Sequence, residues 1–194
     1  MIKFYHNPQS RAVMTHCLLE ELKVPYESII VEYGDGSMRT PEFLELNPMG
    51  KIPVIQDGEV VVTESTAIFI YLADKYKTHR DLAPGIHDKN RGEYLRWLVF
   101  ASTCIDPAMA QANLKFEGKR QQLGWGSPEL VFDTVTKRLE SADPYLFGSQ
   151  LTAADILLGM SMAWATQFGL AKKTETIDKY LSHLQKLDSW NINS

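Results

Sequence analysis

Cysteine is nearly absent from this chain, and the two that occur have no redox or metal-binding spacing. They are Cys17 and Cys104, far apart in 194 residues, and no C-x-x-C pair is present. The five histidines are scattered, without the spacing of metal ligands. We therefore expect both cysteines to be reduced. We expect no disulfide framework, no zinc centre and no other bound metal.

The chain also lacks a surplus of basic charge and a long apolar run. Against 20 Lys and Arg there are 24 Asp and Glu, a formal charge of −4, so neither nucleic acid nor an anionic membrane is favoured as a partner. The first residues lack the apolar core of a signal peptide, and no run approaches the ~18 apolar residues of a membrane span. We expect a soluble cytoplasmic protein in which an anionic ligand is bound by local groups.

The two parts of the chain differ in periodicity. Residues 1–77 alternate between strand-like and helix-like segments in the order βαβ, helix, ββα, which predicts an α+β domain with a mixed four-stranded sheet. Residues 78–88 are polar and contain a Pro-Gly breaker, so a linker is predicted there. Residues 89–194 show helical spacing without a convincing strand, and they predict an all-α second domain.

The expected elements can be placed by residue range. In the first domain we predict strands at 2–5, 26–31, 54–56 and 60–62, helices at 10–23, 41–46 and 64–76, and a hairpin turn at Asp57-Gly58. In the second domain we predict four helices. The first spans 90–115 and is bent or interrupted at Pro107, and the second spans 128–142 with Ser127 as its N-cap. The third follows a capping box from Thr152 to Asp155, and the fourth spans 177–187.

The segment from Asn47 to Ser65 is predicted to form one wall of a site for a small, acidic, peptide-like ligand. Pro53 enters a strand directly after Ile52 and cannot donate to a sheet ladder. If the bond between them is cis, the backbone of Ile52 turns outward and can pair with an extended ligand; a trans proline at a strand start is the alternative. Both fit the local sequence.

The helix that follows this wall opens with Thr63-Glu64-Ser65. Thr63 is a good N-cap, and Ser65 can offer an N–H and a hydroxyl to a carboxylate at the positive end of the helix dipole. Glu64 can hold an ammonium group, so the motif suits an amino-acid head group. Simple capping with an acidic first turn is the alternative.

The loop after the first strand contains Asn7-Pro8-Gln9-Ser10. In a thioredoxin-like unit this loop carries a C-P-x-C redox pair, but here Asn7 and Ser10 occupy the two cysteine positions. Their amide and hydroxyl are donors that can stabilise an incoming thiolate. Both residues can equally well cap the helix.

These segments, in this order, resemble the cytosolic glutathione transferase family, and in detail its bacterial members. The resemblance covers nearly the whole chain, and the combination of NPMGKIPV with TES, AI and YL is specific. The matching segments are NPQSRAV, EFLELNPMGKIPVI, the DG hairpin, TESTAIFIYLADKY, RGEYLRWLVF and FGSQLTAADILLG.

The resemblance implies a thioredoxin-like N-terminal domain, an all-helical C-terminal domain, a homodimer and a cis bond before Pro53. It implies glutathione as co-substrate, with no covalently bound cofactor. The backbone of Ile52 would pair with the cysteinyl part of glutathione. The other roles implied are Glu64 and Ser65 at the γ-glutamyl end, Lys51 and Arg39 at the glycine carboxylate, and Thr152 with Asp155 as a structural capping box outside the site.

The first loop departs from the family pattern. Many members have a serine immediately before the loop proline, where this chain has Asn7. Asparagine can donate a hydrogen bond to a thiolate but cannot act as a base or nucleophile, so Ser10 and Tyr5 are further candidate donors.

A pocket for a hydrophobic electrophile is expected between the domains. The candidates to line it are Tyr5, Tyr94, Trp97, Leu98, Ala101 and Ile105. The spacing of the last five along the predicted helix is equally that of ordinary core residues. The short segment 190–194 after the last predicted helix would leave this pocket open. Three functions follow: addition of glutathione to electrophiles, glutathione-dependent reduction of disulfides or peroxides, and non-catalytic binding of glutathione.

Overall fold

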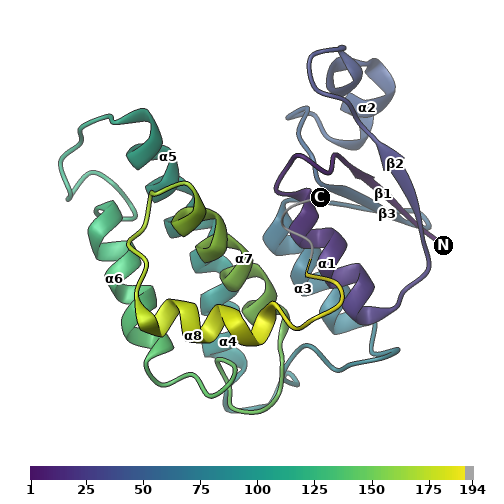
Figure 1. The fold of residues 1–194 in the computed structure, drawn as a ribbon. Helices are drawn as coiled ribbons and strands as arrows, with labels where there is room; N and C mark the ends of the chain where they lie inside the picture. The colour runs from purple at the N-terminus through teal and green to yellow at the C-terminus, as the bar shows by residue number, and fades with distance from the viewer. Residues whose placement is uncertain (191–194) are drawn as a thin grey trace. The chain divides into compact units, whose positions relative to one another are not determined.

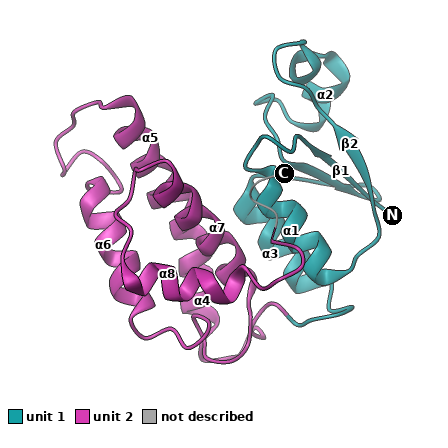
Figure 2. Ribbon diagram, in the orientation of Figure 1, with its two compact units in different colours: residues 1–81, 191–194 teal, residues 82–190 magenta. Residues whose placement is uncertain are grey.

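The computed structural model describes residues 1–190, which form two compact units. Unit 1 comprises residues 1–81 and unit 2 residues 82–190 (Figure 2). The boundary between the units falls within the polar segment 78–88. Each unit has its own core, and each is described separately below.

Unit 1 is built on a four-stranded mixed sheet in the order β2-β1-β3-β4. The strands are β1 (Ile2–His6), β2 (Tyr26–Ile30), β3 (Val54–Asp57) and β4 (Val60–Thr63). β1 pairs in parallel with β2 and antiparallel with β3, which pairs antiparallel with β4. Gly58 turns the β3–β4 hairpin with a φ of +64°, which confirms the turn predicted at Asp57-Gly58.

Helices lie on both faces of this sheet. α1 (Ala12–Leu22) and α3 (Ser65–Lys75) lie side by side (Figure 1), on the face to which Phe4 of β1 points. The next side chain, Tyr5, points to the opposite face. There it meets Phe43 of the short α2 (Pro41–Leu46), which follows the 3-10 turn η1 (Ser37–Arg39). The predicted α+β, thioredoxin-like unit is confirmed.

Unit 2 is helical, and the described residues 82–190 contain no β-strand. Its elements are α4 (Arg91–Phe100), the π-helical segment η2 (Ala101–Ile105), α5 (Asp106–Leu114), α6 (Pro128–Leu139), α7 (Ala153–Gln167) and α8 (Glu175–Leu184). Nearly every residue of α7 is buried, and α4, η2 and α8 pack against this central helix.

The helix predicted over 90–115, with a bend or interruption at Pro107, is present as α4, η2 and α5. Pro107 stands in the first turn of α5, and η2 precedes it directly. A proline cannot donate to the carbonyl four residues before it, so the helix cannot continue regularly through this point. The wider turns of η2 take up the mismatch, and the hydroxyls of Ser102 and Thr103 donate to the Val99 carbonyl in the same stretch.

The helix starts that depend on short-range capping were predicted well. Ser127 accepts a hydrogen bond from the N–H of Leu130 and begins α6. The last helix begins two residues earlier than predicted, because the Thr174 side chain accepts from the N–H of Ile177. The sequence carried this signal, a threonine three residues before an apolar position.

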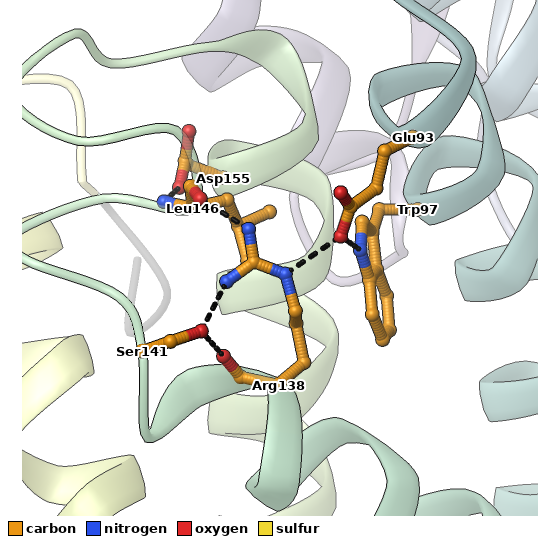
Figure 3. A network of polar contacts seen from close by, with 6 residues as sticks. All are labelled: Glu93, Trp97, Arg138, Ser141, Leu146 and Asp155. Carbon is orange, nitrogen blue, oxygen red and sulfur yellow. Dashed lines mark hydrogen bonds and ion pairs between the residues drawn. The ribbon is translucent and has the colours of Figure 1, made fainter. Parts of the chain in front are cut away.

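A polar network ties α4, α6 and α7 together inside unit 2 (Figure 3). Arg138 donates to Glu93 at 2.8 Å, to the Ser141 hydroxyl at 3.0 Å and to the Leu146 carbonyl. Glu93 also accepts from the Trp97 indole at 3.2 Å. The N–H of Leu146 donates to the buried Asp155 at 2.7 Å. The loop before α7 is thus fixed from both sides.

Asp155 is the acceptor at the centre of unit 2. One carboxylate oxygen accepts from the Leu146 N–H and the Tyr180 hydroxyl, the latter at 2.9 Å. The other accepts from the Thr152 N–H and hydroxyl at 2.9 and 2.6 Å. The predicted capping box is present, and it also anchors α8 through Tyr180.

Candidate functional site

The register of the sheet brings the predicted site residues of unit 1 to one end. Tyr5 of β1 lies opposite Val54 of β3, which lies opposite Thr63 of β4. Because β3 runs antiparallel to its neighbours, the residues just before Val54 lie next to those just after β1 and β4. Asn7, Ile52 and the pair Glu64-Ser65 therefore gather at the same end of the sheet.

The loop that precedes β3 is shaped by a buried asparagine. Asn47 is 4% exposed; its amide donates to the Lys51 carbonyl at 2.8 Å and accepts from the Met49 N–H at 3.1 Å. Its own carbonyl accepts from the Gly50 N–H at 2.8 Å. Asn47 was predicted only as the start of the wall, and its positioning role was missed. The Asn-Pro dipeptide was the available signal.

Gly50 brings two cationic residues together. Its φ is +60°, and a Cβ on it would lie 2.7 Å from the Met38 carbonyl oxygen and 2.9 Å from Nη1 of Arg39. The Arg39 guanidinium thus lies against the backbone of Gly50, directly before the exposed Lys51. Two positive groups at one end of this loop suit a carboxylate.

The bond between Ile52 and Pro53 is cis, as the resemblance implied. The Ile52 side chain packs against the cluster of Val31, Phe43 and Val54, and Pro53 is buried. Within residues 1–190, the Ile52 backbone N–H and C=O have no hydrogen-bond partner. An unpaired backbone unit at a strand start is available to an extended ligand.

The start of α3 differs from the prediction. Thr63 was expected to cap this helix, but it still pairs with Val54 in the sheet, and the N-cap residue is Glu64. Glu64 has φ +67° and ψ +120°, a conformation that side-chain-bearing residues rarely adopt. This turn lets the chain pass from β4 into α3 within one residue. It places Ser65 at the first, electropositive turn of α3, with the Glu64 side chain exposed beside it.

Asn7 is buried and its amide is fully occupied. Its Nδ2 group donates to the Val31 carbonyl and to a carboxylate oxygen of Glu32, both at 3.2 Å. Its Oδ1 accepts from the Gln9 N–H at 2.9 Å. The amide therefore holds the loop to the end of β2.

Ser10 is engaged in the same way. Its hydroxyl donates to the Asn7 carbonyl at 2.7 Å and accepts from the Ala12 N–H at 3.0 Å. The Ser10 hydroxyl thus meets the first N–H of α1, whereas the Asn7 amide binds the end of β2 and the Gln9 N–H. The positive end of the α1 dipole remains at this loop.

His6, which precedes the loop, brings no charge to it at neutral pH. It is buried, stacks on Phe4 at 4.3 Å between ring centroids, and shares a 2.7 Å hydrogen bond with the Ser28 hydroxyl. Burial, and secondly the neighbouring His16, lower the pKa of His6 to about 4. The ring is therefore neutral at pH 7.

The residues predicted for the electrophile pocket belong to two different units. Tyr5 is in unit 1, where its ring meets Phe43 edge-on and its hydroxyl reaches Gln56 at 3.5 Å. The others are in unit 2, and each is at most 2% exposed: Tyr94, Trp97, Leu98, Ala101 and Ile105. In this conformation they are core residues, and Trp97 is also bound to Glu93. The segment 191–194 lies outside the described residues.

Residues 1–190 contain neither a candidate metal site nor a candidate membrane-spanning helix. No group of three or more His, Cys, Asp or Glu side chains is arranged to hold a metal ion. No helix in this part of the chain has the length and apolarity needed to cross a membrane.

Comparison with known proteins identifies the family. Residues 1–74 match the family model described as the glutathione S-transferase N-terminal domain. Glutathione S-transferase F10 of Arabidopsis thaliana is 31% identical over 156 residues, which cover 75% of this chain and 71% of that protein. The disulfide-bond oxidoreductase YfcG of Escherichia coli strain K12 is 30% identical over 169 residues, covering 80% of this chain and 76% of YfcG.

Solved structures show the same fold over almost the whole chain. A glutathione transferase homolog from Lodderomyces elongisporus, crystallised with two GSH per subunit, has a TM-score of 0.78 at 24% identity and covers 97% of this chain and 94% of that one. The chain therefore belongs to the glutathione S-transferase family. Its relatives include proteins named as glutathione S-transferases and one named as a disulfide-bond oxidoreductase.

Proposed function

We propose that this protein binds glutathione at the end of its sheet and activates the glutathione thiol for attack on electrophilic small molecules. The observation that carries the proposal is the convergence of three kinds of group: the unpaired backbone of Ile52, the helix start at Glu64-Ser65 and the cations of Arg39 and Lys51. Together they match an extended tripeptide with a charge at each end.

The proposed orientation follows from the order of these groups. The γ-glutamyl carboxylate would accept from the N–H and hydroxyl of Ser65, and its ammonium group would meet Glu64. The cysteinyl residue would pair with the Ile52 backbone, and the glycine carboxylate would lie near Lys51 and Arg39. Each charged group of the ligand then has a counterpart of opposite sign.

In this orientation the ligand's thiol would lie near Asn7 and the positive end of α1. No cysteine is present in the loop, so the reacting sulphur is that of glutathione itself. Lowering its pKa by two units requires about 2.7 kcal/mol of preference for the thiolate. The α1 dipole supplies part of this, and hydrogen bonds from Asn7 or Ser10 would have to supply the rest.

A second candidate is glutathione-dependent disulfide or peroxide reduction. One observation favours it: the similarity to the E. coli disulfide-bond oxidoreductase. Turnover of a mixed disulfide but not of an activated aryl halide would select this reaction. Tight glutathione binding with neither activity would select a non-catalytic role.

Ser65→Ala and Glu64→Gln, two changes at the start of α3, are each expected to weaken glutathione binding about tenfold. Each change removes one charge-assisted contact, worth about 1.5 kcal/mol, and Glu64→Gln keeps the shape of the side chain in its unusual backbone conformation. Isothermal titration calorimetry with reduced glutathione measures the effect.

Glu59→Gln is the matched control, because Glu59 is an exposed glutamate in the turn between β3 and β4, at the opposite end of β4 from Glu64. The glutathione affinity of the Glu59→Gln protein should equal that of the wild type. Equal affinity of all four proteins for glutathione would refute the proposed site.

We also propose a homodimer formed through the exposed face of α3. Ala67, Ile70 and Tyr71 line an open, mainly apolar hollow on this helix with Asp74 and Lys75, and such surfaces favour association. We expect a dimer for the wild type and a monomer for Ala67→Glu in sedimentation velocity, since the new charge would be buried in the interface. Ser182→Glu, on the exposed side of α8, is the control. A dimeric Ala67→Glu protein would argue against this surface.

A further inference from the structure

We propose that Glu32 is a positioning residue that competes with the sulphur of bound glutathione for the side-chain amide of Asn7. This inference rests on the proposed function. It assigns to Glu32, which no sequence motif marked, the control of how readily the bound thiol ionises.

The amide of Asn7 has no donor to spare. An Nδ2 group carries two protons, and in this structure they are directed to the Val31 carbonyl and to Glu32, each at 3.2 Å. Because Asn7 is 4% exposed, water does not replace these partners easily. A thiolate can obtain a hydrogen bond from Asn7 only if one of the two present acceptors gives it up.

The two acceptors differ in how easily they can leave. The Val31 carbonyl belongs to a buried residue whose N–H donates to the His6 carbonyl at 2.8 Å, so it is held by the backbone. Glu32 is exposed, and its contact with Asn7 is made by a flexible side chain beyond the end of β2. The carboxylate is therefore the acceptor that can be exchanged.

The position of Asn7 makes this exchange relevant to the ligand. The register of β1 with β3 ends at Tyr5 and Val54, so Asn7 lies at the same end of the sheet as Ile52, whose backbone is the proposed partner of the cysteinyl residue. A thiolate there and the Glu32 carboxylate are both anions that seek the same N–H. Each disfavours the other, both by competition for the donor and by repulsion of like charge.

Few other ionisable groups accompany Asn7 in this loop. His6 is neutral at pH 7, as its lowered pKa shows. Tyr5 is turned to the α2 face and reaches Gln56, and Arg11 is an exposed residue at the start of α1 that has contacts of its own. Glu32 is the ionisable side chain that contacts the Asn7 amide directly.

The test is an ultraviolet titration of the thiol of bound glutathione in single and double variants. Glu32→Ala is expected to lower the thiol pKa by about one unit, about a tenfold gain in ionised fraction at a pH below that pKa. Glu32→Gln should give a smaller decrease, because it removes the charge but keeps an acceptor. Glu27→Ala removes the same charge from an exposed position on the same strand and should leave the pKa unchanged.

The decisive comparison is made in the Asn7→Ala background. If Glu32 acts through the Asn7 amide, Glu32→Ala should change the thiol pKa less than half as much in the Asn7→Ala protein as in the protein that retains Asn7. An unchanged pKa in Glu32→Ala, or an equal shift with and without Asn7, would overturn the inference. Calorimetry on the same proteins separates the two proposals: failure to bind glutathione counts against the site, whereas normal binding without the shift counts against Glu32 alone.

Discussion

Replacing Asp155 with alanine is expected to lower the free energy of unfolding by about 4 kcal/mol. The buried carboxylate of Asp155 accepts four hydrogen bonds, from the N–H of Leu146, the hydroxyl of Tyr180, and the N–H and hydroxyl of Thr152. Without it, these donors are left buried with no acceptor. The loss would loosen α8 and the start of α7 together.

Thermal and urea unfolding measure this effect, and the melting temperature should fall by about 10 °C. Asp155→Asn keeps the size of the side chain and part of its acceptor capacity, so about half the loss is expected. Asp133→Ala is the control: Asp133 is an exposed aspartate on α6, and its removal should change stability by less than about 0.5 kcal/mol. Asp155→Ala with wild-type stability would mean that the network is incidental.

Replacing Gly50 with alanine is expected to damage both stability and glutathione binding. The new Cβ would lie 2.7 Å from the Met38 carbonyl oxygen, a backbone atom that cannot rotate away, in addition to the cost of a positive φ. We expect a loss of about 3 kcal/mol in stability. Since the loop must shift to relieve the clash, Lys51 and Ile52 would move, and glutathione affinity should fall at least about tenfold.

Gly58 provides a matched control for this experiment. Its φ of +64° is almost that of Gly50, but a Cβ there meets nothing within 4 Å. Gly58→Ala should therefore cost about 1 kcal/mol and leave glutathione binding unchanged. Urea unfolding and calorimetry on both variants measure the difference. Equal losses in the two variants would show that backbone strain alone, and not the contact with Met38, requires a glycine at position 50.

The parts of the fold that were predicted correctly depend on neighbouring residues. A turn such as Asp57-Gly58, a cap such as Ser127 before Pro128 and the box from Thr152 to Asp155 are determined within a few residues of chain. Hydrophobic spacing then separates the strands of unit 1 from the helices of unit 2. Short-range physics of this kind can be read from one sequence.

The errors arose where a distant contact overrides a local preference. Thr63 has the side chain of a good N-cap, yet its pairing with Val54 keeps it in β4 and moves the cap to Glu64. Distant contacts also determine what the predicted donor Asn7 binds in this structure, since its amide donates to residues 24 and 25 positions away. The role of Asn47 and the contact of Gly50 with Met38 likewise require the folded loop.

By itself, the sequence determined the two-part architecture and the family. It also marked the segment from Asn47 to Ser65 that is proposed to form the wall of the glutathione site. These features could be predicted because periodicity, turn chemistry and capping are local. Only the tertiary structure decided which groups of that site are available. The register of the sheet placed Asn7, Ile52 and Ser65 at one end. Long-range hydrogen bonds occupy the amide of Asn7, whereas the backbone of Ile52 has no partner within residues 1–190. Availability depends on contacts between residues far apart in the chain, which a local pattern does not encode.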